Sequence, residues 1–212
     1  MGKTTFVQNL ANAMGRDCET ISLAGFKESR EYSILGDDKK PSLVAWAIKK
    51  QGSKNPVILL DELEKVEDKK IQQDLIKLFK GYKNIGTKKE KKFYDKYFQT
   101  EIDLSHISFF ATANYIDDLE MKLKNKVDVN EISDFTYDEK KAILKMKAKE
   151  INNKYSEKND GIITEKIIDE ILKQIKEVGV RQAERALRKI EEEYIYSKIN
   201  NEKFTATENP QE

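Results

Sequence analysis

The chain has 212 residues, of which 36% are charged and 38% are hydrophobic. Its 39 lysines and arginines nearly balance 38 acidic residues, so the chain lacks the basic excess of a dedicated nucleic-acid binder. A single cysteine excludes an internal disulfide and a cysteine-based metal site. No apolar run approaches the about eighteen residues of a membrane span. We therefore expect a soluble cytoplasmic protein whose partners are neither membranes nor nucleic acids.

Helix-like and strand-like segments alternate over the first part of the chain, which is typical of a mostly parallel sheet covered by helices. The hydrophobic pattern predicts helices over 4–14, 43–50 and 69–80, and strands over 20–23, 57–60 and 107–111. The apolar stripe of the first helix is predicted to consist of Phe6, Val7, Leu10 and Ala13. The lysine-rich stretch 81–92 is predicted to be an exposed loop.

The pattern changes after residue 135, because only helical periodicity follows. The apolar faces of these helices are supplied mainly by Ile162, Ile163, Ile167, Ile168, Ile171, Leu172 and Ile175. We predict an α/β domain over residues 1–135, a small helical domain over 136–205 and a frayed tail over 206–212.

A short motif at the start of the chain points to phosphate binding. Gly2, Lys3 and Thr4 open the first predicted helix and have the form of the last part of a phosphate-binding loop. In such a loop, backbone amides hold phosphate oxygens, the lysine meets the β- and γ-phosphates, and the threonine ligates magnesium. The tripeptide alone is weak evidence, because a glycine and a lysine also occur at ordinary chain ends.

Two further polar groups follow predicted strands. Asp61 and Glu62 come directly after the apolar run 57–60, where an aspartate can orient magnesium and a glutamate can polarise the attacking water. Asn114 follows the strand 107–111. Taken alone, a charged pair at the end of a strand is commonplace, and Asn114 is also compatible with an ordinary turn. Open parallel sheets bind ligands at the carboxyl ends of their strands, so the three signals together predict a nucleotide site.

Several stretches occur in the order and near the spacing of one known family. They are 22–25 (SLAG), 52–65 (GSKNPVILLDELEK), 93–98 (FYDKYF), 103–105 (DLS), 109–114 (FFATAN), 135–140 (FTYDEK) and 179–185 (GVRQAER). Together they resemble the ATPase module of the Lon protease family, a branch of the AAA+ ATPases. The resemblance covers roughly residues 2–195 and implies a three-layer parallel-sheet P-loop NTPase domain followed by a helical lid, with ATP between them.

The resemblance also implies roles for individual residues. Those implied to bind ATP are Gly2, Lys3, Thr4, Thr5 and Asp61, with Thr4 and Asp61 on Mg²⁺. Those implied to act in hydrolysis are Glu62, the sensor 1 residue Asn114, the sensor 2 residue Arg181, and Lys126. The implied function is a motor that hydrolyses ATP to unfold or translocate polypeptide for an ATP-dependent protease. Its implied partners are copies of itself in a ring, or other AAA+ or peptidase subunits.

The sequence departs from this family in three places. The chain starts at Met1, in the middle of the family's phosphate loop, so we expect weaker nucleotide binding. Lys126 occupies the place of the arginine finger, and an ammonium cannot reproduce the bidentate fork of a guanidinium. The family's substrate-gripping loop carries an aromatic residue next to a glycine, whereas the corresponding residues here are 32–36, so we expect Tyr32 or Ile34 to grip a polypeptide less firmly.

These departures leave alternatives to a working motor. One is a degenerate AAA+ module that binds other subunits without hydrolysing ATP. Another is the product of a split gene, without an independent function. A peptidase activity is not expected from this chain, because it carries no Gly-x-Ser-x-Gly nucleophile motif and no segment after the helical domain that could form a peptidase domain.

Overall fold

The computed structural model describes residues 2–24, 26, 31–82, 91–155, 161–175, 179–200, 202 and 204. The chain forms two compact units, Gly2–Asn130 and Glu131–Glu212. The N-terminal unit contains α1 (Lys3–Ala13), β1 (Cys18–Ser22), α2 (Leu43–Gln51), β2 (Val57–Asp61), the 3-10 helix η1 (Leu63–Lys65), α3 (Lys69–Tyr82), β3 (Lys92–Asp95), β4 (Thr100–Asp103), β5 (Ser108–Ala111) and α4 (Met121–Lys124). The C-terminal unit contains α5 (Tyr137–Tyr155), α6 (Glu165–Gln174) and α7 (Arg181–Ile199).

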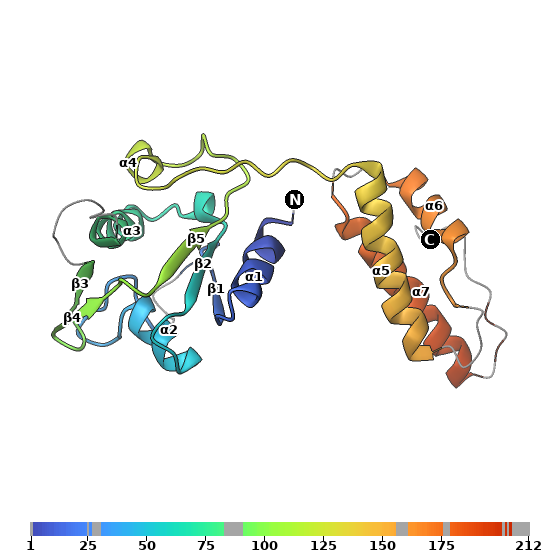
Figure 1. The fold of residues 1–212 in the computed structure, drawn as a ribbon, viewed down its shortest axis with the longest axis horizontal. Coiled ribbons are helices and arrows are strands. Elements are labelled where there is room, and N and C mark those ends of the chain that lie inside the picture. Colours follow the sequence, from blue (N-terminus) through green and yellow to red (C-terminus); the bar gives the residue numbers. More distant parts are fainter. Residues whose placement is uncertain are drawn as a thin grey trace. The chain divides into compact units, whose positions relative to one another are not determined.

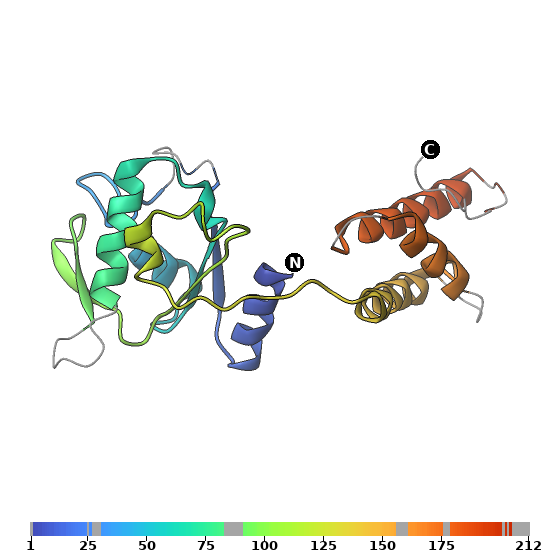
Figure 2. The same ribbon diagram turned by 90° about the horizontal axis from the view of Figure 1, so that it is seen from above.

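A parallel sheet with the strand order β1-β2-β5 forms the centre of the N-terminal unit. Helix α1 covers one face, and α2 and α3 cover the other (Figures 1 and 2). The side chains of β2 alternate accordingly: Val57 and Leu59 pack against α1, while Ile58 and Leu60 join the larger core under α2 and α3. The predicted three-layer α/β fold with its three parallel strands is therefore confirmed.

The buried face of α1 differs from the predicted stripe. Val7 and Ala11 are buried against the sheet, whereas Phe6 is 56% exposed and Ala13 is also exposed. Val7 and Ala11, which are four positions apart and so share one face of the helix, are the buried residues that contact the sheet, where they meet side chains from all three strands. The prediction is therefore right for Val7 and wrong for Phe6 and Ala13. This short helix has more apolar residues than its contact with the sheet can cover.

The region between α3 and β3 also differs from the prediction. Helix α3 continues through Gly81 to Tyr82, and β3 already begins at Lys92, so the predicted loop 81–92 was wrong at both ends. A Cβ atom at Gly81 would lie 2.9 Å from the carbonyl oxygen of Lys92, so a glycine is what allows this close approach. The part of the predicted loop over 83–90 lies outside the described residues.

The antiparallel hairpin β3–β4 was not predicted. Its inward positions are Phe93 and Asp95, and the second of these is fully buried. The Asp95 carboxylate accepts hydrogen bonds from the backbone N–H groups of Ser42 (2.9 Å), Tyr97 (2.9 Å) and Phe98 (3.1 Å). It thereby joins the hairpin turn to the N-terminus of α2. An acidic residue at an inward position hides the apolar alternation that would otherwise indicate a strand.

Arg16 joins the end of α1 to the segments that enter β2 and β5. Its guanidinium donates hydrogen bonds to the carbonyl oxygens of Asn55 (2.7 Å), His106 (2.8 Å) and Pro56 (3.2 Å) and to the hydroxyl of Ser108 (2.8 Å). The planar fork of the guanidinium suits several acceptors held at fixed positions.

We expect Arg16→Lys to lower the free energy of unfolding of the N-terminal unit by about 2 kcal/mol, because an ammonium cannot reach these acceptors at once. The midpoint of urea denaturation measures the loss. Arg185→Lys on the exposed face of α7 is the matched control and should leave the midpoint unchanged. Equal midpoints for Arg16→Lys and the unmodified chain would contradict a stabilising role of the fork.

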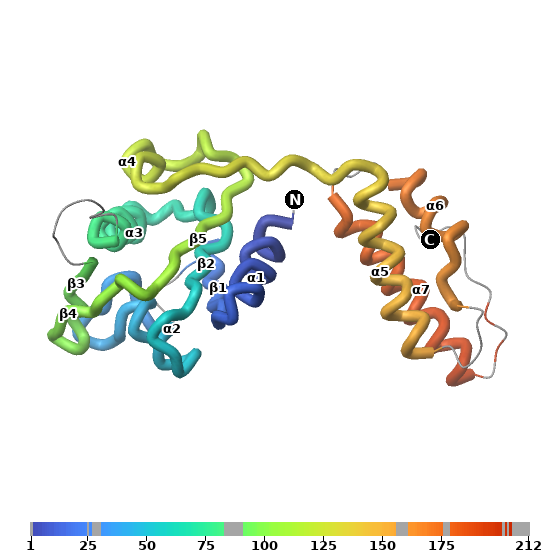
Figure 3. The backbone as a smooth tube through the Cα atoms, in the orientation of Figure 1, coloured from blue at the N-terminus to red at the C-terminus, as the bar shows by residue number. Residues whose placement is uncertain are grey.

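The C-terminal unit is a small helical domain in which α5 and α7 run alongside each other (Figure 3). Its core includes Leu144, Ala148, Ile151, Ile163, Ile168, Ile171, Ala183, Leu187 and Ile190. The prediction that only helices follow residue 137 is confirmed for the described residues. Among all the residues that the structure describes, in both units, no helix is long and apolar enough to cross a membrane.

Candidate active site

The N-terminus of α1 meets the carboxyl ends of β2 and β5, where Asp61 accepts two hydrogen bonds. The hydroxyl of Thr4 donates to Asp61 Oδ1 at 2.9 Å, and the hydroxyl of Thr112 donates to the same oxygen. Thr112 also accepts a hydrogen bond from the backbone N–H of Glu62 at 3.1 Å. The aspartate is therefore fixed between a residue of α1 and a residue that follows β5.

A second set of contacts surrounds Asn114. Lys3 Nζ donates to Asn114 Oδ1 at 2.9 Å, and Asn114 Nδ2 donates to Glu64 Oε1 at 2.8 Å. Lys3 and Asn114 are separated by 111 positions in the sequence. The structure thus brings together the predicted phosphate-binding lysine and the predicted sensor asparagine.

The first turn of α1 is suited to an anion. Gly2 is the N-cap residue with a φ of 82°, it provides no side-chain cap, and the first turn contains no acidic residue. The backbone amides at the start of a helix carry partial positive charge, which the ammonium of Lys3 reinforces. Thr5 lies in the same turn and is exposed. Gly2, Lys3 and Thr5 thus lie on a surface that favours phosphate groups.

Glu62 adopts a left-handed backbone conformation, with φ 61° and ψ 52°. This conformation costs a non-glycine residue about 1–2 kcal/mol. With this conformation, Glu62 lies between the end of β2 and the start of η1. The N–H of Leu63, the first residue of η1, donates to the carbonyl oxygen of Thr112 at 2.9 Å. Strained residues cluster at functional sites, so the conformation supports a role for Glu62 beyond folding.

Comparison with known proteins identifies the family of this chain. Residues 1–135 match the model of the ATPase family associated with various cellular activities (AAA). The chain belongs to the AAA family. The predicted Lon resemblance is also confirmed, because Lon proteases match this AAA chain along most of its length.

Three of these relatives show the extent of the match. The AAA chain is 30% identical to Lon protease of Mycoplasma mycoides subsp. mycoides and 31% identical to that of Ureaplasma parvum serovar 3, in each case over 95% of this chain and 26% of the relative. It is 32% identical to Lon protease of Metamycoplasma arthritidis, over 95% of this chain and 25% of the relative. The chain thus spans about a quarter of the length of the curated relatives it matches.

Two residues of the AAA site were missed in the sequence. Thr112 is 5% exposed and joins Asp61 to Glu62, but a β-branched residue beside an apolar strand indicates only strand propensity. Glu64 contacts Asn114 from η1, but one acid in a charged stretch carries no distinguishing pattern. The position of Thr112, in contrast to its residue type, could have identified it as a site residue. It is the first residue after β5, at the edge of the sheet where ligands bind.

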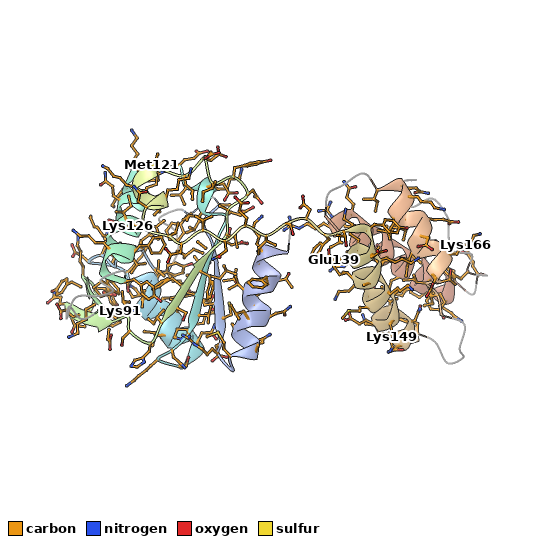
Figure 4. All side chains as sticks on the ribbon, turned by 45° about the horizontal axis from the view of Figure 1, so that its top comes forward. Lys91, Met121, Lys126, Glu139, Lys149 and Lys166 are labelled. Carbon is orange, nitrogen blue, oxygen red and sulfur yellow. The ribbon has the colours of Figure 1, made fainter. Side chains whose placement is uncertain are left out.

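The contacts described for this site do not include Lys126 or Arg181. Lys126 lies in the turn after α4, where its N–H donates to the carbonyl oxygen of Leu123 at 2.9 Å (Figure 4). Arg181 is exposed at the start of α7, in the C-terminal unit of the AAA chain. The roles implied for both residues remain predictions.

Tyr32 and Ile34 are not available to grip a polypeptide. They are 6% and 2% exposed, respectively, and belong to the core of the N-terminal unit. The ring of Tyr32 packs on that of Trp46, with a centroid distance of 4.4 Å. The implied role of Tyr32 or Ile34 in substrate gripping was therefore wrong, because burial against α2 stabilises these side chains more than exposure would.

The residues at the AAA site fit Mg²⁺ that arrives with a nucleotide. The Thr4 hydroxyl and Asp61 carboxylate are hard oxygen donors within 2.9 Å of each other, which suits this cation. The described residues contain no group of three or more His, Cys, Asp or Glu side chains that could hold a metal ion. The metal would therefore depend on these two oxygens together with water and phosphate oxygens.

Proposed function

We propose that this AAA chain binds ATP with Mg²⁺ and hydrolyses it at the carboxyl edge of its sheet. The observation that carries the proposal is the pair of contacts Thr4–Asp61 and Lys3–Asn114, at 2.9 Å each. They unite the start of α1 with the ends of β2 and β5, which the sequence separates widely. Packing alone does not explain why the four polar side chains converge where parallel strands bind ligands.

The proposed mechanism assigns binding to α1 and water activation to β2 and β5. Lys3 and the first amides of α1 bind the phosphates, and Thr4 and Asp61 hold Mg²⁺, which neutralises phosphate charge when bound. The Lys3–Asn114 hydrogen bond is exposed, so exchange of this partner for a phosphate costs little. Glu62 polarises the attacking water, which Asn114 orients.

Roles for Arg181, Lys126 and Thr5 are proposed from the sequence resemblance alone. Arg181 would contribute positive charge at the γ-phosphate, Thr5 would contribute to phosphate binding, and Lys126 would act on a neighbouring subunit in place of an arginine finger.

The similarity to Lon proteases supports a wider proposal about the purpose of hydrolysis. ATP turnover would drive the unfolding or translocation of a polypeptide for an ATP-dependent protease in the cytoplasm. The chain would work in a homo-oligomeric ring or together with other AAA+ or peptidase subunits, with no peptidase activity of its own.

Replacement of Lys3 with alanine tests the nucleotide site. We expect ATP affinity to fall by about 10- to 100-fold, because the ammonium that meets the phosphates is lost. Isothermal titration with MgATP measures the affinity. Lys49→Ala, which removes an exposed lysine from α2, is the matched control and should bind as the unmodified chain does.

Two outcomes would contradict the proposal. Equal affinities for Lys3→Ala and the unmodified chain would place the nucleotide elsewhere. No binding by the unmodified chain up to millimolar ATP would remove the motor function altogether, and would favour a module that binds other subunits without nucleotide.

A further inference from the structure

The amide of Asn114 has only one orientation that satisfies both of its neighbours. The ammonium of Lys3 can only donate hydrogen bonds, and an ionised Glu64 carboxylate can only accept them. The carbonyl oxygen of Asn114 therefore faces Lys3 at 2.9 Å, and its NH₂ group faces Glu64 at 2.8 Å. The exposed amide is thus held from both ends.

Glu64 belongs to an element that is anchored beside the strand ends. Its 3-10 helix η1 is anchored by Leu63, which is 2% exposed and whose N–H donates to Thr112 at 2.9 Å. The N–H of Lys65 donates to the carbonyl oxygen of Glu62 at 2.9 Å and closes the turn. Lys3, by contrast, is expected to leave Asn114 when phosphate binds. Glu64 is then the partner that remains.

Packing alone does not account for a carboxylate at position 64. Its Oε1 atom accepts from Asn114, but its Oε2 atom is buried and has no hydrogen-bond partner among the described residues. A buried oxygen without a partner destabilises the folded state, and an apolar side chain at this position would avoid that cost. Such an unsatisfied group in a folded protein points to a function.

We propose that Glu64 is a positioning residue that turns the carbonyl oxygen of Asn114 toward the nucleotide. By accepting the Nδ2–H of Asn114, it leaves Oδ1 as the group that faces the phosphates and accepts a hydrogen bond. In the free chain that bond comes from Lys3, and in the ATP-bound chain it comes from the attacking water. This inference rests on the proposed ATPase function and deepens it, because it makes Asn114 a hydrogen-bond acceptor toward the nucleotide and a donor only toward Glu64.

Four variants test the hydrogen-bond polarity in steady-state ATP hydrolysis. Glu64→Ala should lower kcat by about 10-fold with KM changed less than about 2-fold, because water orientation is lost while phosphate binding stays. Glu64→Gln keeps an acceptor and should stay within about 3-fold of the unmodified chain. Asn114→Asp places two carboxylates together and should lower kcat by about 100-fold. Adding Glu64→Gln to Asn114→Asp restores a donor–acceptor pair and should recover at least about 10-fold.

The recovery in the double variant is the decisive result, since a merely structural role of Glu64 would not produce it. Lys65→Ala, an exposed neighbour on η1, is the control and should match the unmodified chain. A kcat for Glu64→Ala equal to that of the unmodified chain would overturn the proposal. A double variant no faster than Asn114→Asp would overturn it as well.

A second readout separates this proposal from the ATPase function. The side-chain NH₂ resonances of Asn114 in an NMR spectrum of the nucleotide-free chain report on its hydrogen bond directly. We expect Glu64→Ala to shift them and to speed their exchange with water, and Lys65→Ala to leave them in place. Unshifted resonances in Glu64→Ala would overturn the role of Glu64, while shifted resonances in a chain that does not hydrolyse ATP would sink the ATPase function alone.

Discussion

Replacing Glu62 with glycine is expected to lower ATP turnover by about 100- to 1,000-fold and to raise the free energy of unfolding by up to about 1 kcal/mol. The loss of turnover and the gain in stability have separate causes at this one residue, its side chain and its backbone conformation. The carboxylate that polarises the attacking water is lost, and glycine adopts the φ of 61° without the clash of a Cβ atom. Steady-state hydrolysis and urea denaturation measure the two effects separately.

Two further variants isolate the causes. Glu62→Gln keeps the strained backbone, so it should lose turnover without a change in stability. Gln99, with a φ of 50°, is the other non-glycine residue with positive φ among those the structure describes. Gln99→Gly should therefore gain similar stability while ATP turnover stays unchanged. A chain that becomes less stable on Glu62→Gly would show that its carboxylate supports the fold.

Asp95→Ala is expected to lower the free energy of unfolding of the N-terminal unit by about 4 kcal/mol, which corresponds to a fall in Tm of about 15 °C. The carboxylate is fully buried, and its loss leaves three backbone N–H groups without their acceptors. Calorimetry measures the change in Tm. Hydrogen exchange at the N–H of Ser42 should accelerate, because this bond joins the hairpin to α2.

The size of the loss should follow the number of bonds removed. Asp95→Asn keeps one oxygen for Tyr97 and Phe98 but loses the bond from Ser42, so we expect about half the loss. Asp103 offers the matched control on the same hairpin. Its exposed carboxylate accepts hydrogen bonds from the backbone N–H and the hydroxyl of Ser105, which lower its pKa. Asp103→Ala should change Tm by less than about 2 °C, and an equal loss for both aspartates would contradict the importance of burial.

Much of the central fold could be predicted because it depends on local patterns. The run Val57–Leu60 is apolar on both faces, and the structure buries it completely between α1 and α2. Helix α2 ends at Gly52, where a φ of 66° favours glycine. The hairpin β3–β4 could not be predicted in this way, because Asp95 is buried by partners that lie 53 positions away in the sequence and in the hairpin's own turn.

The same distinction applies to the site. Gly2, Lys3, Asp61 and Asn114 occur next to helix and strand ends that the sequence shows, and the parallel order of the strands brings Lys3 to Asn114 and Thr4 to Asp61. Glu64 lacks such a local signal. Its contact with Asn114 depends on how the chain turns after Glu62, and a left-handed glutamate is not indicated by any residue preference.

The packing of Tyr32 on Trp46 gives this chain an intrinsic optical label. Trp46 is its single tryptophan, and the ammonium of Lys50 lies 4.7 Å from the centroid of the indole ring. The C-terminal unit contains no tryptophan, so fluorescence excited at about 295 nm comes from the N-terminal unit alone. Far-ultraviolet circular dichroism, in contrast, reports helices of both units. A single titration read in both ways can therefore reveal whether the two units unfold together or one after the other.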